Sequence, residues 1–157
     1  MYDWPLVIQI HTLAAIFALI VGPIAIWRKR RDIWHRVAGM AWIVLMLIVA
    51  TSAWFIHGIK LVGPFSPIHL FSLLVYYSLL QAIRHLRAGR YHAHGKAMRS
   101  LYLQSLGIAG IFTLLPGRRM SMLLFGDHVL LAVCAMAVLG CALIYLLWRK
   151  PRLQILR

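Results

Sequence analysis

Five apolar stretches, each close to the length needed to cross a lipid bilayer, take up most of this 157-residue chain. They run over residues 5–27, 37–56, 67–83, 97–115 and 128–148. A helix needs about 20 apolar residues to cross the hydrocarbon core of a membrane. Only three residues are acidic and 62% are hydrophobic, so a water-soluble domain of this size could not bury the apolar surface. The sequence therefore predicts an all-α integral membrane protein in which residues 1–157 form a single transmembrane domain.

The basic residues are concentrated in alternate connections between these stretches. Residues 28–36 and 84–99 carry five Lys or Arg each, and the tail from Arg149 carries four, whereas 58–66 and 116–127 carry one and two. Loops on the cytoplasmic side of a membrane protein are enriched in Lys and Arg. We therefore expect five transmembrane helices in a bacterial cytoplasmic (inner) membrane, with the N-terminus outside and the C-terminus in the cytoplasm. The first four helices would form an up-and-down bundle, with the fifth added to it.

The net charge of +14 has a different meaning here from the one it would have in a soluble protein. A nucleic-acid-binding protein gathers its basic residues on one face or along one helix. In this chain they follow the loop pattern of a membrane protein instead. The expected partner is therefore the lipid bilayer, and nucleic acid is not expected.

Two pairs of histidines are expected to lie at matching depths in the membrane. His11 lies 17 residues before Arg28, and His69 lies 15 residues before Arg84. At about 1.5 Å per residue, both imidazoles should lie roughly 22 to 26 Å above the cytoplasmic edge. The second pair, His35 and His94, precedes the second and fourth apolar stretches at the cytoplasmic side. Each pair would come from diagonal helices of the predicted bundle.

One imidazole from each side at the same height is the arrangement that holds a haem through two axial histidines. The pair His11 and His69 would ligate an outer haem b, and His35 and His94 an inner one. Arg118, near one face, is a candidate partner for a haem propionate, because arginine forms paired hydrogen bonds with carboxylates.

Two other interpretations of the histidines stay open. His35 and His94 lie in basic segments where histidine is common, and Asp32 could cap the second helix with His35 in its first turn. An outer cluster could instead bind zinc or copper, which neutral imidazole suits. Its members would be His11, His57, His69 and His128.

The first four apolar stretches also show a faint internal repeat. His11 precedes His35 by 24 residues, and His69 precedes His94 by 25. Each pair spans an apolar stretch followed by a basic loop. The pattern is consistent with two similar helix hairpins in the same orientation, and chance similarity is the alternative explanation.

Four segments resemble a family of small bacterial membrane proteins known as domain of unknown function 2306. They are HRVAGMAW (35–42), FSPIHLFSLL (65–74), HGKAMRSLY (94–102) and GIAGIFTLLPGR (107–118). The resemblance implies a polytopic membrane protein and carries no assigned activity. The positions that recur in the family match His11, His35, His69, His94, Met98, Pro116, Gly117 and Arg118. Gly95 and Ala97 stand where basic and bulky aromatic residues are usual.

Three functions follow from these observations as hypotheses. The first is a b-type cytochrome-like protein that exchanges electrons with a membrane quinone through bis-histidine haem. The second is a non-catalytic subunit or assembly factor that packs against other membrane subunits of a respiratory or photosynthetic complex. The third is a metal-handling membrane protein that uses the outer histidines. The apolar stretches contain no Asp or Glu, so the usual proton or sodium relay of a transporter is excluded.

Overall fold

The computed structural model describes residues 5–28, 30–56, 67–116 and 118–148, and every regular element in these ranges is a helix. The prediction of an all-α chain is therefore confirmed. Its elements are α1 (Leu6–Trp27), α2 (Ile33–Ala53), α3 (Pro67–Arg87), α4 (Tyr91–Leu101), the π-helix η1 (Tyr102–Gly107), α5 (Ile108–Thr113), α6 (Arg119–Phe125) and α7 (Val129–Trp148). They form two compact units, Met1–Leu101 and Tyr102–Arg157.

Two of the described helices, α1 and α2, are both long enough and apolar enough to cross a membrane. In α7 the shorter stretch Val129–Tyr145 is apolar. Large apolar side chains of α1 point away from protein, with Leu13, Phe17 and Ile20 each more than half exposed. Lipid is the solvent that such a surface requires, because water would make this exposure costly.

Several helices extend beyond the apolar stretches that predict them. α2 begins at Ile33, four residues before its stretch, because Asp32 provides an N-cap. α3 continues four residues past its stretch to Arg87, and its last turn contains Arg84, His85 and Arg87. Positive charge at a helix C-terminus interacts favourably with the helix dipole. Helix ends in this chain therefore follow capping and charge rather than hydropathy alone.

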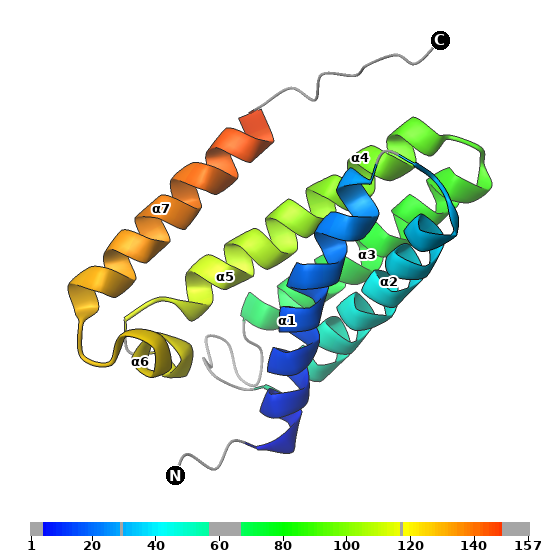
Figure 1. Ribbon diagram of the computed structural model, residues 1–157. Helices are drawn as coiled ribbons and strands as arrows, with labels where there is room; N and C mark the ends of the chain where they lie inside the picture. Colours follow the sequence, from blue (N-terminus) through cyan, green and yellow to red (C-terminus); the bar gives the residue numbers. More distant parts are fainter. Residues whose placement is uncertain (1–4, 29, 57–66, 117, 149–157) are drawn as a thin grey trace. The chain divides into compact units, whose positions relative to one another are not determined.

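In the first unit, α1 to α4 lie side by side and consecutive helices run in opposite directions (Figure 1). α1 packs along α2, α2 against α3, and α3 along α4. This order makes α1 and α3 one diagonal pair and α2 and α4 the other. The two histidine pairs therefore come from diagonal helices, as the sequence predicts.

Small residues line the buried face of α1 and large ones fill the centre of the unit from α2. The buried positions of α1 are Ala14, Ala18, Gly22 and Ala25. In α2, which packs along α1, Trp42 and Met46 are 1% and 0% exposed. Residues three or four apart share a helix face, so α1 presents one continuous stripe of small side chains to the bundle. The stripe lets the backbone of α1 approach its neighbour closely.

The second unit contains η1 and α5 to α7. The expected helix over 97–115 is divided among α4, η1 and α5, because the hydrogen-bond pattern widens to a π-helix between Tyr102 and Gly107. A Cβ atom placed on Gly107 would come within 2.7 Å of Leu143 Cδ1 in α7. A larger residue at this position would require the side chain of Leu143 to move, so glycine lets η1 and α7 pack without that change. The short helix α6, which hydropathy does not predict, ends at Gly126 with φ of 56°.

Candidate functional site

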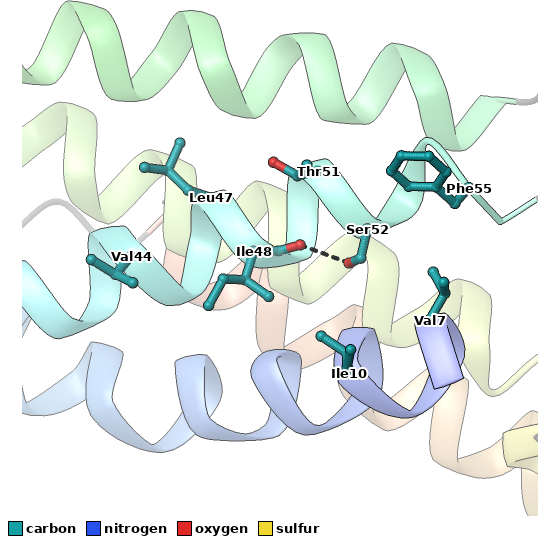
Figure 2. Close-up of a pocket in the computed structure, with 8 residues that line it drawn as sticks. All are labelled: Val7, Ile10, Val44, Leu47, Ile48, Thr51, Ser52 and Phe55. Atoms are coloured by element: carbon teal, nitrogen blue, oxygen red, sulfur yellow. Dashed lines mark hydrogen bonds between the residues drawn. The ribbon is translucent and has the colours of Figure 1, made fainter. Parts of the chain in front are cut away.

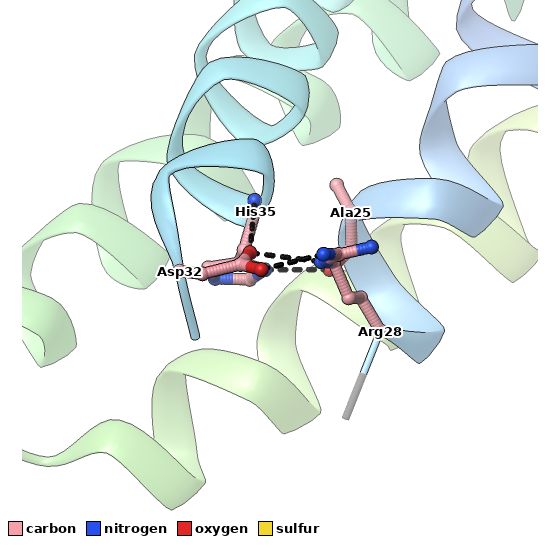
Figure 3. Close-up of polar contacts among 4 residues, drawn as sticks. All are labelled: Ala25, Arg28, Asp32 and His35. Atoms are coloured by element: carbon pink, nitrogen blue, oxygen red, sulfur yellow. Dashed lines mark hydrogen bonds and ion pairs between the residues drawn. The ribbon is translucent and has the colours of Figure 1, made fainter. Parts of the chain in front are cut away.

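The turn between α1 and α2 is held by one charged pair that also caps the second helix. Arg28 Nε donates to Asp32 Oδ1 over 2.8 Å, and Arg28 Nη2 donates to Asp32 Oδ2. The same Oδ1 accepts a hydrogen bond from the backbone N–H of His35 at 3.2 Å (Figure 3). The expected N-cap is therefore confirmed. It fixes His35 in the first turn of α2.

Electrostatics in this turn favour the charged form of both residues. Hydrogen bonds from Arg28 hold the pKa of the Asp32 carboxyl well below its usual range, and the N–H of His35 lowers it further. The carboxylate in turn raises the pKa of the Arg28 guanidinium. The pair thus remains ionised across the physiological pH range.

We expect this ion pair to give the folded protein a specific pH dependence. Because the pKa of Asp32 is lowered in the folded state, its contribution to stability is complete above the usual aspartate pKa of about 3.9 and is lost as the pH falls below it. In detergent, the melting temperature of the wild type should therefore fall towards that of Asp32→Asn as the buffer is acidified. Asp127→Asn, a change at the exposed acidic residue before α7, is the control and should follow the wild type. A constant difference between wild type and Asp32→Asn at all pH values would contradict the expectation.

The ring of His35 contacts both the preceding helix and the loop that leads into α2. Nδ1 lies 2.8 Å from the carbonyl oxygen of Ala25 in α1. A carbonyl only accepts, so Nδ1 carries the hydrogen and Nε2 carries a lone pair in the neutral ring. Nη1 of Arg31 lies 3.1 Å from Nε2 and 3.4 Å from Nδ1. A nitrogen almost equally distant from both ring nitrogens lies over the face of the imidazole, so the guanidinium of Arg31 stacks on the ring of His35.

His94 has the same arrangement in the second hairpin. Its Nδ1 lies 2.9 Å from the carbonyl oxygen of Ala82, on the preceding helix α3. Nδ1 is again the donor, and Nε2 is left with the lone pair. Among the residues that the structure describes, His94 Nε2 has no hydrogen-bond partner.

Arg31 lies next to the segments that carry both histidines of the predicted inner pair. Its Nη1 is 3.1 Å from Nε2 of His35. A Cβ atom on Gly95, the residue after His94, would lie 3.9 Å from its Nη2. The structure thus places the first turn of α2 and the His94 segment of α4 next to one another.

The outer pair meets at the last turns of α2. His11 Nδ1 lies 2.9 Å from Ser52 Oγ. His69, only 5% exposed, directs Nε2 to the carbonyl oxygen of Trp54 over 3.2 Å. Its ring centroid is 5.1 Å from that of Trp54, at an interplanar angle of 50°. α1 and α3 therefore place their histidines against the same end of α2.

The partners of these histidines could not be found from the sequence. Ser52 is one of several hydroxyl residues in the apolar stretches, and no spacing rule singles it out. The acceptors supplied by Ala25, Ala82 and Trp54 are backbone carbonyls, which leave no signal in residue identity. Such partners are common for ligating histidines, because they set which ring nitrogen carries the hydrogen.

Other candidate residues fall outside the first unit or outside the described residues. His57 belongs to the latter, so the alternative outer metal cluster of His11, His57, His69 and His128 has no complete structural description. His128 and Arg118 lie in the second unit, where Arg118 is the N-cap residue of α6. No group of three or more potential His, Cys, Asp or Glu metal ligands occurs among the described residues.

His85 is a partly buried residue of a helix rather than of the loop that follows it. It lies in the last turn of α3, because that helix continues past its apolar stretch. Its Nδ1 is buried and has no hydrogen-bond partner within the described ranges. Burial of an unpaired ring nitrogen is costly, which makes this position unlike the exposed His92.

An open apolar groove of about 420 Å³ runs between α1 and α2 (Figure 2). Ser52 lies in its wall and donates to the carbonyl oxygen of Ile48 over 2.7 Å. Almost all of the exposed lining is apolar, so the groove suits hydrocarbon rather than water. Its lining residues are Val7, Ile10, Val44, Leu47, Ile48, Thr51, Ser52 and Phe55.

Comparison with known proteins gives one match. Residues 8–148 match the model of a family described as "Predicted membrane protein (DUF2306)". No curated protein and no solved structure is significantly similar to the chain. The match covers both compact units and includes all four candidate haem ligands.

Proposed function

The chain belongs to this DUF2306 family of predicted membrane proteins, and from that premise we propose that it is a membrane-embedded haem b protein that transfers electrons. The axial ligands are His11 with His69 on the outer side and His35 with His94 on the inner side. Haem iron bound by two imidazoles cycles between its ferric and ferrous states and so supplies one-electron transfer.

The observation that carries the proposal is the orientation of the histidine rings. His11, His35 and His94 each place Nδ1 within 2.9 Å of an oxygen atom of the protein. Histidines that ligate a metal characteristically give the hydrogen of one ring nitrogen to such an oxygen and bind the metal through the other. Of these three, His11 lies within an apolar stretch, where an ionisable side chain is costly and usually functional.

A flat macrocycle between the histidines would displace part of the core of the first unit, which Trp42 and Met46 of α2 fill. Ala14, Ala18 and Gly22 give α1 a buried face without bulk, next to the helices that carry the histidines. Met46, fully buried in α2, has an unbranched side chain that adapts easily to a new neighbour. The first unit therefore has both the donor atoms and an adaptable interior.

Two ligands need a local rearrangement before they can bind iron through Nε2. Arg31 must move away from the ring of His35. His69 donates from Nε2 to the carbonyl oxygen of Trp54, so it must release that oxygen and carry its ring hydrogen on Nδ1 instead. A freed Arg31 could then pair with a propionate, because guanidinium and carboxylate form strong paired hydrogen bonds. His11 and His94 need no such change of partner at Nε2.

The proposal includes five membrane spans in a bacterial cytoplasmic membrane, with the N-terminus outside and the C-terminus inside. It is supported by the alternation of basic and nearly uncharged connections along the chain. A fluorescent protein fused to the C-terminus should therefore fluoresce, and alkaline phosphatase fused there should be inactive. The reverse result would contradict this orientation.

A membrane quinone is the proposed redox partner, since it reaches an integral membrane protein through the lipid. The haem itself is tested first. Protein purified in mild detergent from cells supplied with a haem precursor should contain up to two extractable haem b groups per chain. It should show an intense Soret band and sharp bands on reduction. A colourless protein with full helical content by circular dichroism would refute the proposal.

A further inference from the structure

The hydroxyl of Ser52 can only accept a hydrogen bond from His11, because its own hydrogen is used elsewhere. The hydroxyl has a single hydrogen. Ser52 Oγ lies 2.7 Å from the carbonyl oxygen of Ile48 and 3.1 Å from that of Val49, and both atoms accept only. That hydrogen is therefore already donated to the backbone of α2 (Figure 2).

The direction of the hydrogen bond between Ser52 and His11 follows from this donation. Since Ser52 Oγ has no hydrogen left to give, it accepts at 2.9 Å from His11 Nδ1. Nδ1 must then carry the ring hydrogen, and Nε2 must carry the lone pair that a metal needs.

The surroundings strengthen the effect of this single contact. Ser52 is 8% exposed, and the groove in whose wall it lies is lined almost entirely by apolar side chains such as Ile10 and Val44. Water cannot readily replace a lost acceptor in such a place. The ring of His11 therefore depends on Ser52 for its Nδ1 hydrogen bond.

His11 also differs from the inner pair in the kind of partner it uses. His35 and His94 donate to backbone carbonyls, which no side-chain substitution removes. Only His11, of these three, depends on a side chain. We propose that Ser52 is a positioning residue that fixes the ring-nitrogen assignment of His11 and so prepares Nε2 as the outer ligand. The role as a ligand rests on the proposed haem function, whereas the nitrogen assignment does not.

The first experiment needs no haem. With ¹⁵N-labelled histidine in detergent-solubilised protein, the side-chain ¹⁵N shifts of His11 report which nitrogen carries the hydrogen. The wild type and Ser52→Thr should show the hydrogen on Nδ1, because threonine keeps the hydroxyl. Ser52→Ala should show it moved to Nε2 or divided between the two nitrogens. Thr51→Val is the matched control. Thr51 directly precedes Ser52, but its Oγ1 lies 2.9 Å from the hydroxyl oxygen of Tyr76 and not at His11.

The second experiment measures haem. Loss of an outer-shell partner typically lowers metal affinity by 10- to 100-fold, so haem bound by His11 should weaken in Ser52→Ala by roughly that factor. The same titration should be unchanged in Thr51→Val and restored in Ser52→Thr. If Ser52→Ala does not fold, Ser52→Cys serves in its place, because sulfur is a weak acceptor of similar size.

The outcomes separate the inference from the proposed function. A Ser52→Ala protein that keeps the hydrogen of His11 on Nδ1 overturns the inference, whatever its haem content. A wild type that shows the predicted nitrogen assignment but binds no haem supports the positioning role and refutes the haem protein. Altered assignment together with weakened haem supports both.

Discussion

Replacing His94 by alanine should remove the inner haem, whereas replacing His92 by alanine should leave it in place. His94 holds its Nδ1 on the carbonyl oxygen of Ala82 and has no partner at Nε2 among the described residues, so no other group competes with iron for that nitrogen. His92 lies in the same turn of α4 but is exposed. The two variants thus compare two histidines on one helix, of which one is held by a hydrogen bond and the other is exposed.

The measurement for this pair is the extractable haem per chain and the reduced-minus-oxidised spectrum. For His94→Ala we expect the loss of one haem and its spectral bands, with the helical circular dichroism retained. An equal loss in His92→Ala would point to damage to α4 rather than loss of a ligand. Full haem content in His94→Ala would contradict the assignment of the inner pair.

A second large effect is expected from His11→Ala, which should remove the outer haem. The substitution deletes the ring that Ser52 holds at 2.9 Å and leaves space next to the apolar groove. Imidazole added to the solution is small enough to enter such a space and bind the iron. We therefore expect the missing spectral bands to return as imidazole is titrated in.

Two observations serve as controls for the outer site. Imidazole should have no effect on the spectrum of the wild type at the same concentrations. The double variant of His11→Ala and His94→Ala should be colourless, because each pair would have lost one ligand. A His11→Ala protein with the full wild-type spectrum would contradict the outer site.

The first helix of the first unit follows closely from the sequence. α1 extends over Leu6–Trp27, against an apolar stretch of 5–27. Hydropathy is effective here because the bilayer forces backbone hydrogen bonds to be made within each span. The N-cap at Asp32 was also predictable, since aspartate before an apolar helix is a local signal.

Some features could not be predicted from the sequence, because they depend on the rotation of each helix and on backbone atoms. The contact of His11 with Ser52 joins residues 41 positions apart, and only the packing of α1 on α2 brings them together. The position of Arg31 beside the ring of His35 depends on the path of the loop between α1 and α2. The π-helix η1 changes the hydrogen-bond pattern without a residue type that marks it.

The structure adds an argument for the faint internal repeat. His35 lies 10 residues after Ala25, to whose carbonyl oxygen it donates, and His94 lies 12 residues after Ala82, with the same geometry. Each hairpin thus joins its second helix to its first through an equivalent hydrogen bond. An equivalent contact in both hairpins is what duplication of one helix pair would produce.

The central claim is that matched histidines on diagonal helices bind haem iron through Nε2. Electron paramagnetic resonance of the oxidised wild-type protein tests it most directly, because the signal reports both the presence of haem and the nature of its axial ligands. We predict low-spin ferric iron with two imidazole ligands. A protein that shows no haem signal, or only high-spin iron, would contradict the claim.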